Sequence, residues 1–210
     1  MSAGAAVRTR VRVLLADDQA LVRGALAALL SLENDLEVVG EVSRGDEVVA
    51  AVLELRPDVA VLDVEMPGID GIAATQAVRA AAPGCRVLVV TTFGRPGYLR
   101  RAMAAGASGF MVKDAPAEQL ADAIRRVASG LRVVDPTLAA ESLAAGESPL
   151  TAREQDVLRA ARDGGTVADI AAALFLSDGT VRNYLSAAIG KTGARTRAEA
   201  VRVAEAQGWL

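Results

Sequence analysis

The sequence of 210 residues contains no histidine and only one cysteine. Without histidine the chain has no base for Ser-His-Asp or Cys-His catalysis, and it lacks the imidazole ligands on which most zinc chemistry depends. A phosphohistidine relay within the chain is excluded as well, so any phosphoryl group must come from another molecule. The lone cysteine, Cys85, rules out an intrachain disulfide, and its place at the start of an apolar run predicts a reduced, partly buried thiol.

Aromatic residues are also scarce, at 3% of the chain, whereas hydrophobic residues make up 52%. Cores built from Val, Leu, Ile and Ala favour helices packed on a sheet over an all-β sandwich. No apolar stretch reaches the roughly 20 residues that span a bilayer, and residues 1–10 are not followed by the apolar block of a secretory signal. We therefore expect a soluble, cytoplasmic protein without a membrane partner, with one medium and one small domain.

Residues 11–129 alternate between short apolar runs and helical patterns, as βαβ units do. The apolar runs predict five strands, at 11–16, 36–42, 59–63, 86–91 and 109–112. Five helices are predicted over 20–30, 46–55, 71–82, 97–105 and 116–129, the first with Leu21, Ala25 and Leu29 along one side. Right-handed crossovers then give an α/β fold, a doubly wound five-stranded parallel sheet.

Polar residues stand at the ends of these apolar runs, namely Asp17, Asp18, Asp63, Thr91 and Lys113. Because the carboxyl ends of parallel strands share one edge of a sheet, we expect an acidic pocket there. A single aspartate after a strand often just caps the next helix, but that reading does not explain the whole set. Three close carboxylates need a cation, and Mg²⁺ fits best. One carboxylate is then free to attack a phosphoryl donor, with Lys113 and Thr91 beside the transferred group.

The remaining chain is helical in pattern after a linker predicted at residues 130–147, which contains a short helical piece. Four helices are predicted over 151–162, 166–174, 178–191 and 197–207, the third capped by Ser177. The second and third helices with their tight turn match a helix-turn-helix, which predicts double-stranded DNA as a partner.

The third of these helices would read bases in the major groove of DNA. Arg182 suits guanine and Asn183 suits adenine, and both lie in its N-terminal half. Phosphate contacts are predicted for Thr180, Lys191, Arg195 and Arg197. From Arg182 to Arg197 there are four cations and no acid, a weak nucleic-acid signal because a solvated helix face gives the same pattern. Ser177 and Ser186 complete the predicted DNA-binding set.

The strings LLADD, VLDVEMPGIDG, VVTTF and GASGFMVKD resemble the motifs of bacterial response-regulator receiver domains, in order, over residues 11–129. This resemblance implies that Asp63 is the phosphoacceptor and that Thr91 and Lys113 contact the phosphoryl group. It also implies that Mg²⁺ is bound by Asp17, Asp18 and Asp63 with the backbone carbonyl of Glu65. Phe110 matches the family's aromatic switch position. Asp114 departs from the proline that many receivers have after the lysine.

LTAREQDVL and IAAALFLSDGTVRNYLSAAIGKTGARTRAEAV are similar to the DNA-binding domain of the NarL/FixJ (LuxR-type) response regulators, over residues 148–210. Ser186 replaces a usual basic residue of the recognition helix. RNYLS, GWL and FGRPGYLRRA resemble the branch that includes the cold-sensing controller of a lipid desaturase. The family implies a sensor histidine kinase as phosphate donor, homodimer formation on phosphorylation, and RNA polymerase as a further partner.

Two other classes of protein remain open. A magnesium-dependent phosphohydrolase with an aspartyl-phosphate intermediate would suit the same pocket, but Glu65 stands in place of the second aspartate of Asp-x-Asp and the helix-turn-helix is left unexplained. We therefore expect a regulator rather than an enzyme. The other alternative is a phosphorylation-independent DNA-binding regulator whose receiver serves only for dimerisation, and retention of the full pocket argues against it.

Overall fold

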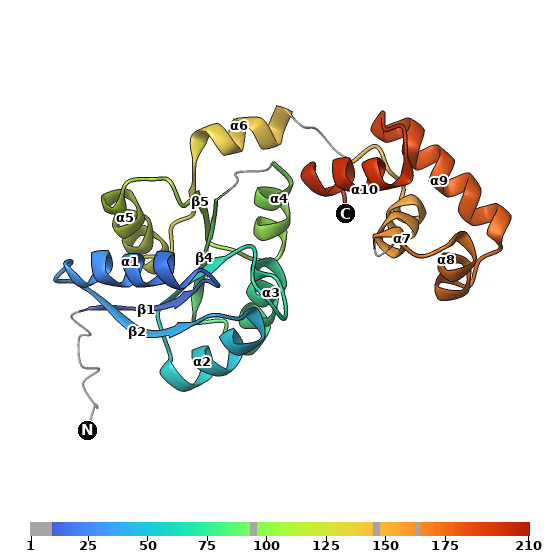
Figure 1. Ribbon diagram of the computed structural model, residues 1–210. Coiled ribbons are helices and arrows are strands. Elements are labelled where there is room, and N and C mark those ends of the chain that lie inside the picture. Colours follow the sequence, from blue (N-terminus) through green and yellow to red (C-terminus); the bar gives the residue numbers. More distant parts are fainter. Residues whose placement is uncertain (1–9, 93–95, 145–147, 163) are drawn as a thin grey trace, which may run out of the picture. The chain divides into compact units, whose positions relative to one another are not determined.

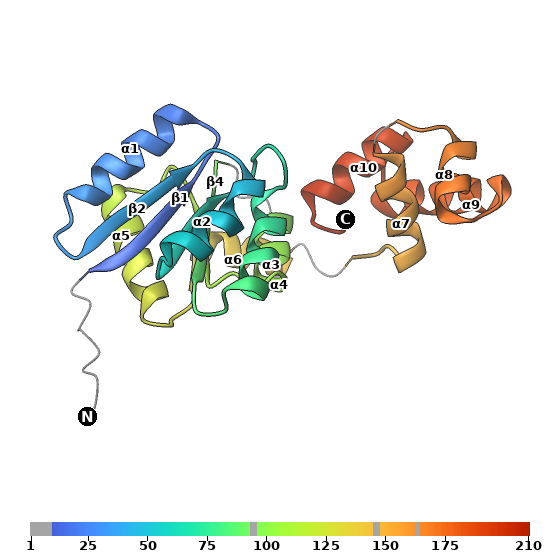
Figure 2. The same ribbon diagram turned by 90° about the horizontal axis from the view of Figure 1, so that it is seen from below.

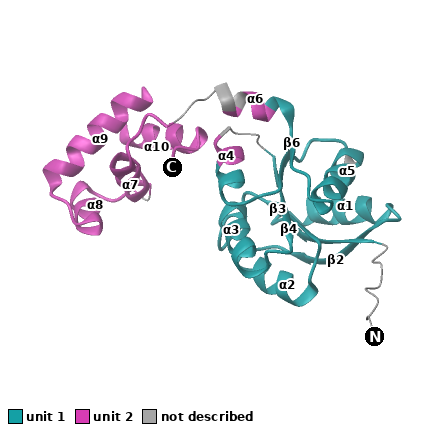
Figure 3. Cartoon of the chain, turned by 180° about the vertical axis from the view of Figure 1, so that it is seen from behind, with its two compact units in different colours: residues 1–94, 101–137 teal, residues 95–100, 138–210 magenta. Residues whose placement is uncertain are grey.

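The computed structural model describes residues 10–92, 96–144, 148–162 and 164–210. Part of the string FGRPGYLRRA, residues 93–95, lies outside the described residues, as do residues 1–9 and residues 145–147 of the predicted linker. The chain divides into two compact units, residues 1–94 with 101–137, and residues 95–100 with 138–210 (Figure 3). No helix in the described part of the chain is long and apolar enough to cross a membrane.

The first unit is built on a parallel sheet with the strand order β2-β1-β3-β4-β5-β6. The strands are β1 (Val11–Ala16), β2 (Leu36–Val42), β3 (Val59–Asp63), β4 (Arg86–Thr91), β5 (Gly109–Val112) and β6 (Val133–Val134). The first five match the predicted strands, and the α/β class with its parallel sheet is confirmed. The sixth strand was missed because two residues, paired with β5, are too short to show a period.

Helices cover both faces of this sheet (Figures 1 and 2). They are α1 (Ala20–Ser31), α2 (Val48–Leu55), α3 (Gly71–Ala81), α4 (Pro96–Ala104) and α5 (Ala117–Ala128), with a 3-10 turn at Gly45–Glu47 before α2. Helices α1 and α5 lie together on one face, and α2 and α3 lie together on the other. Strands β3 and β4, between these layers, are almost wholly buried, which explains their continuous apolar sequences.

The side of α1 that the pattern suggested is not the buried one. Leu21 is 86% exposed, whereas Leu30 is 2% exposed and packs in the core with α5. Leu26 and Ala27 lie partly buried against the same core. The helix reads ALVRGALAALLS, with apolar residues nearly all round, so its periodicity cannot select a face and packing against β1 and α5 decides.

The second unit carries the predicted bundle of helices. It comprises α7 (Ala152–Ala161), α8 (Val167–Leu174), α9 (Asp178–Thr192) and α10 (Arg197–Ala206), while α6 (Pro136–Ala144) is the short helix predicted within the linker. Each of α7 to α10 begins at a Thr or Ser whose hydroxyl accepts a backbone N–H three residues on. Val157, Ile170, Val181 and Ala200 contribute one buried side chain from each helix to the core. This core fixes α8 and α9 in a helix-turn-helix.

Candidate functional site

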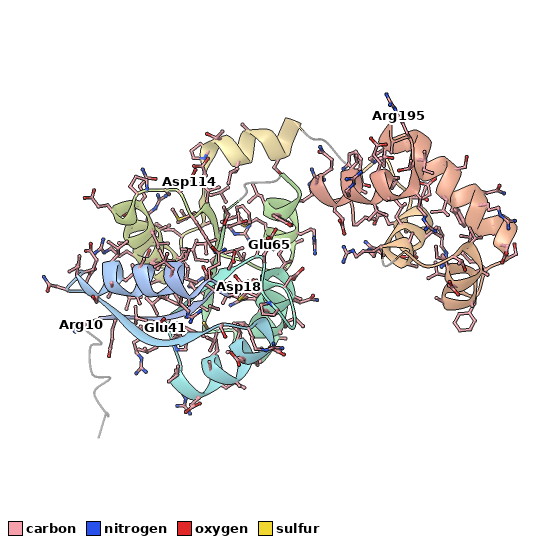
Figure 4. The ribbon with its side chains drawn as sticks, in the orientation of Figure 1. Arg10, Asp18, Glu41, Glu65, Asp114 and Arg195 are labelled. Carbon is pink, nitrogen blue, oxygen red and sulfur yellow. The ribbon has the colours of Figure 1, made fainter. Side chains whose placement is uncertain are left out.

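The predicted pocket residues meet at one edge of the sheet, beside the point where the strand order reverses between β1 and β3. Asp17 follows β1 and Asp63 ends the neighbouring β3, while Thr91 ends β4 and Lys113 follows β5. The register keeps these ends level, since Asp63 is paired with Val90. Asp18 and Glu65, labelled in Figure 4, come from the loops after β1 and β3 at this same edge.

The three aspartates form a tight cluster. One carboxylate oxygen from each of Asp17, Asp18 and Asp63 lies within 4.8 Å of the others. Asp17 and Asp63 are each 2% exposed, whereas Asp18 is exposed at the pocket mouth. The Lys113 ammonium bridges the two buried carboxylates, at 2.6 Å from Asp17 Oδ2 and 2.9 Å from Asp63 Oδ2. Among the described residues, Lys113 is thus the cation that pairs with these carboxylates.

This arrangement changes the pKa values of the buried groups. Burial raises the pKa of the Asp63 carboxyl, and the charge of Asp17 acts in the same direction, against the opposing effect of Lys113. Burial acts to lower the pKa of Lys113, but hydrogen bonds and charge from Asp17 and Asp63 outweigh it, so that pKa is raised. Lys113 thus stays an ammonium, while its single charge, shared by two carboxylates, does not compensate Asp63 for its burial.

The donor set fits a divalent cation. Three carboxylates offer hard oxygen ligands, and the one ammonium beside them leaves net negative charge in a partly buried site. Asp17, Asp18 and Asp63 are the side chains that would hold Mg²⁺. The role predicted for the Glu65 carbonyl stays a prediction, but the Glu65 backbone N–H donates a hydrogen bond to the Asp63 carboxylate.

A further cation near the pocket was missed by sequence reasoning. Arg23 Nη1, on α1, donates to the backbone carbonyl of Asp17 at 2.6 Å, and Arg23 Nε lies 3.4 Å from Glu41 Oε2 on β2. The Gln19 N–H also donates to Asp17 Oδ1 at 2.9 Å. These contacts fix the loop that carries Asp17 and Asp18. The sequence feature that could have revealed this contact is the position of Arg23, in the first turn of the helix that follows Asp17 and Asp18.

The two residues predicted to take part in switching are both buried. Thr91 is 2% exposed at the end of β4, and its backbone carbonyl accepts the Lys113 N–H at 2.8 Å. Phe110, on β5, is fully buried within the receiver core. The backbone of β4 is thus joined directly to the residue that pairs with Asp63.

On the second unit, α9 presents a row of exposed residues on one side. Arg182, Asn183 and Ser186 are exposed, whereas Val181 and Leu185 face the core. The Ser177 hydroxyl caps the helix by accepting the Thr180 N–H at 3.2 Å, and the hydroxyls of the two residues lie 2.8 Å apart. Helix α9 is therefore held by its inner face and free along its outer face, as a groove-reading helix must be.

The cations predicted to contact phosphate differ in their surroundings. Arg195 is exposed and projects outward (Figure 4). Lys191 Nζ lies 2.8 Å from Oε2 of Glu154 on α7, and Arg197 Nη1 donates to the Gly165 carbonyl at 2.7 Å. Lys191 and Arg197 thus have partners within the domain. Their DNA contacts stay predictions.

Comparison with known protein families agrees with both units. Residues 13–125 match the response regulator receiver domain, and residues 148–204 match the bacterial regulatory proteins of the luxR family. Together these models cover most of the chain, so the predicted pairing of a receiver with a LuxR-type DNA-binding domain is confirmed.

Individual relatives share the whole arrangement. The chain is 44% identical over 200 residues to the uncharacterized transcriptional regulatory protein YvfU of Bacillus subtilis, covering 95% of this chain and 100% of that one. It is 42% identical to the transcriptional regulatory protein DesR of Bacillus subtilis, covering 95% and 99%. The crystal structure of ChrA, the response regulator of a heme-sensing two-component system, is 34% identical with a TM-score of 0.58, covering 96% and 100%. The chain therefore belongs to the NarL/FixJ family of two-component response regulators, which are DNA-binding transcriptional regulators.

Proposed function

We propose that Asp63 is the residue whose phosphorylation switches this regulator. The proposed domains are a receiver at 11–129, a linker at 130–147 and a DNA-binding domain at 148–210. The observation that carries the proposal is the shared Lys113 ammonium, which touches Asp63 and Asp17 in a buried pocket with three carboxylates. The pocket has an acid to modify, a cation to receive the new phosphoryl group, and unbalanced negative charge for a metal.

The proposed reaction moves a phosphoryl group from a histidine of a sensor kinase to Asp63. A carboxylate oxygen of Asp63 attacks phosphorus, a P–O bond forms, the P–N bond to the kinase imidazole breaks, and the imidazole nitrogen keeps the electron pair. Lys113, 2.9 Å from Asp63 Oδ2, would pair with the new phosphoryl oxygens, and the Thr91 hydroxyl, at the end of β4, would donate to one of them. Mg²⁺ bound by Asp17, Asp18 and Asp63 would neutralise charge on the carboxylates and on the phosphoryl oxygens.

Phosphorylation gives Lys113 a more highly charged partner than either carboxylate. Because the Lys113 N–H is bonded to the Thr91 carbonyl, the ends of β4 and β5 respond together, and Phe110 lies on β5 three residues before Lys113. The altered receiver surface favours a homodimer. A dimer presents two α9 helices to DNA half-sites about one helical turn apart, which raises affinity for a promoter and brings the regulator to RNA polymerase.

Acetyl phosphate with Mg²⁺ tests this proposal on the full chain without a kinase. Intact mass is expected to increase by one phosphoryl group, which peptide mapping places on Asp63, and a sizing column is expected to show a shift towards dimer. Omitting Mg²⁺ should prevent both changes. No mass gain in folded protein, or a gain on another residue, would reject Asp63 as the phosphoacceptor.

Asp63→Asn separates this proposal from the regulator whose receiver only dimerises. The amide cannot form the acyl phosphate, so the variant should neither gain mass nor bind a selected DNA sequence more tightly after treatment. If Asp63→Asn binds that DNA as tightly as the treated wild type, phosphorylation is not the switch.

A further inference from the structure

The loop between β3 and α3, residues 64–70, connects Asp63 to the rest of the receiver. Its ends are fixed by backbone bonds, from the Val64 N–H to the Val90 carbonyl at 3.1 Å and from the Gly71 N–H to the Val64 carbonyl at 2.9 Å. The Glu65 N–H donates to the Asp63 carboxylate. Its middle, Pro67 to Ile69, is exposed and has few side chains to pack. Contacts from elsewhere must therefore hold the middle of this loop.

Those contacts come from the turn after β2, residues 44–46. The Gly45 N–H donates to the Pro67 carbonyl at 3.0 Å, and Gly45 is buried. A Cβ at Gly45 would overlap the backbone carbonyl of Ile69, which cannot move aside as the end of a side chain can. Only glycine therefore lets this turn approach the loop so closely.

A second contact lies beside the first. Gly68 has a φ of +85°, and a Cβ there would meet the carboxylate of Asp46. Arg44 holds that carboxylate with two hydrogen bonds, at 3.0 Å from Oδ1 and 2.7 Å from Oδ2. The turn thus places one backbone group and one oriented carboxylate against the same loop.

We infer that Gly45 and Asp46 are positioning residues for the metal site, holding the β3–α3 loop so that the Glu65 backbone keeps its place beside Asp63. This inference rests on the proposed function. Among the described residues no hydrogen bond or ion pair joins this turn to the three carboxylates, so it acts through the loop. Moving the loop should therefore weaken Mg²⁺ binding more than it slows phosphoryl transfer once the metal is bound.

Gly45→Ala tests the inference through metal affinity in the unphosphorylated chain. Titration calorimetry with MgCl₂ is expected to show a Kd increased about tenfold, since loss of an outer contact that orients a metal site typically costs about 10–100-fold in affinity. With acetyl phosphate, half-saturating Mg²⁺ should rise by the same factor, while the rate at saturating Mg²⁺ stays within about twofold of wild type.

Two further variants are measured beside Gly45→Ala, one as a control and one as a substitute. Gly24→Ala on α1 is the matched control, because a Cβ there meets no atom within 4 Å, and its Mg²⁺ affinity should equal that of wild type. Asp46→Ala changes an exposed side chain and should increase the Kd by about threefold. If circular dichroism shows that Gly45→Ala does not fold, the Mg²⁺ affinity of Asp46→Ala tests the inference in its place.

The outcomes separate the inference from the function on which it rests. A wild-type chain that neither binds Mg²⁺ nor accepts phosphate refutes the proposed function. A wild-type chain that does both, with folded Gly45→Ala showing the wild-type Kd, refutes only the inference. The inference also fails if Gly24→Ala weakens Mg²⁺ binding as much as Gly45→Ala, or if Asp46→Ala has no effect when Gly45→Ala is unfolded.

Discussion

Each unit of the chain contains a buried carboxylate paired with a lysine, and the two ion pairs have nearly the same length. In the receiver, Lys113 lies 2.9 Å from Asp63, which is 2% exposed. In the DNA-binding unit, Lys191 lies 2.8 Å from Glu154, which is 4% exposed. Nevertheless, the pKa of Asp63 is raised and that of Glu154 is lowered. The length of the ion pair is thus insufficient to predict the direction of the pKa shift, and the surroundings differ, since the Lys113 side chain is 8% exposed and that of Lys191 is 38% exposed.

The two sites differ in how deeply the pair is buried and in how many groups share the lysine. Asp63 and Asp17 share the single charge of Lys113. The effect of burial on Asp63 therefore outweighs that of the lysine, and the pKa of Asp63 is raised. Burial acts to raise the pKa of Glu154 too, but Lys191 and the Thr151 N–H, which donates at 2.6 Å, outweigh it. Glu154 also completes the capping box of α7. One carboxylate is left short of positive charge and suits a metal and a phosphoryl group, whereas the other is fully satisfied and suits a scaffold.

The largest expected effect therefore comes from Glu154→Ala. It removes half of the capping box and the ion-pair partner of Lys191, whose side chain is 38% exposed, and should destabilise the DNA-binding unit by about 2–3 kcal/mol. Trp209, the only tryptophan, packs against the core of this unit, so its fluorescence during urea unfolding gives the free energy. Thr151→Ala removes only the cap and should cost about 1 kcal/mol. If Glu154→Ala lowers the free energy of unfolding by no more than Thr151→Ala does, the ion pair between Lys191 and Glu154 contributes nothing to stability.

A smaller effect is expected from Arg182→Ala, measured on DNA binding. Arg182 is exposed on α9, and its Nη2 lies 3.6 Å from Asp178 Oδ2. Its loss should weaken binding to a sequence selected from a randomised pool by about 1–3 kcal/mol and relax the preference at one base pair. Fluorescence anisotropy at several salt concentrations measures both the affinity and its salt slope.

Lys191→Met is the matched comparison for that measurement. If Lys191 serves chiefly to satisfy Glu154, the variant should lose stability, while the salt dependence of DNA affinity keeps the wild-type slope. A slope reduced by about one would instead make Lys191 a phosphate contact, and the contrast between the two lysines would then be one of degree.

Positions fixed by the sheet could be predicted from the sequence. Asp17, Asp63 and Lys113 end apolar runs, and parallel pairing must bring strand ends to one edge, so the pocket followed without knowledge of side-chain contacts. Helix surfaces were harder to predict. Leu21 and Leu30 read alike in an apolar helix, and only packing against the sheet and α5 determines which is buried.

Partners distant in sequence could not be predicted at all. Lys191 was grouped with the DNA-facing cations because an exposed basic end looks the same whether its lysine meets phosphate or a buried carboxylate. Glu154 is 37 residues away, and its sequence showed only a cap. Arg23 was missed for a related reason, since its acceptor is a backbone carbonyl, which no residue type reveals.

The smallest effect, and the most direct test of the contrast between the two carboxylates, is the pH dependence of stability. The raised pKa of Asp63 means that its ionisation costs stability as pH rises through that pKa. In Mg²⁺-free buffer at neutral pH, Asp63→Asn should therefore stabilise the receiver, by about 1 kcal/mol or roughly 4 °C in calorimetry. This gain should disappear as pH falls below the ordinary aspartate pKa, where the wild-type carboxyl is protonated in both the folded and unfolded states.

Glu154→Gln should show the opposite sign in the other unit. Because the pKa of Glu154 is lowered, its ionised form contributes stability above the ordinary glutamate pKa, and that contribution is lost as pH falls through the folded value. The variant should be less stable than wild type at neutral pH, with a deficit that shrinks on acidification. Two differences of the same sign would mean that the depth of burial and the sharing of the lysine do not set the two pKa values apart.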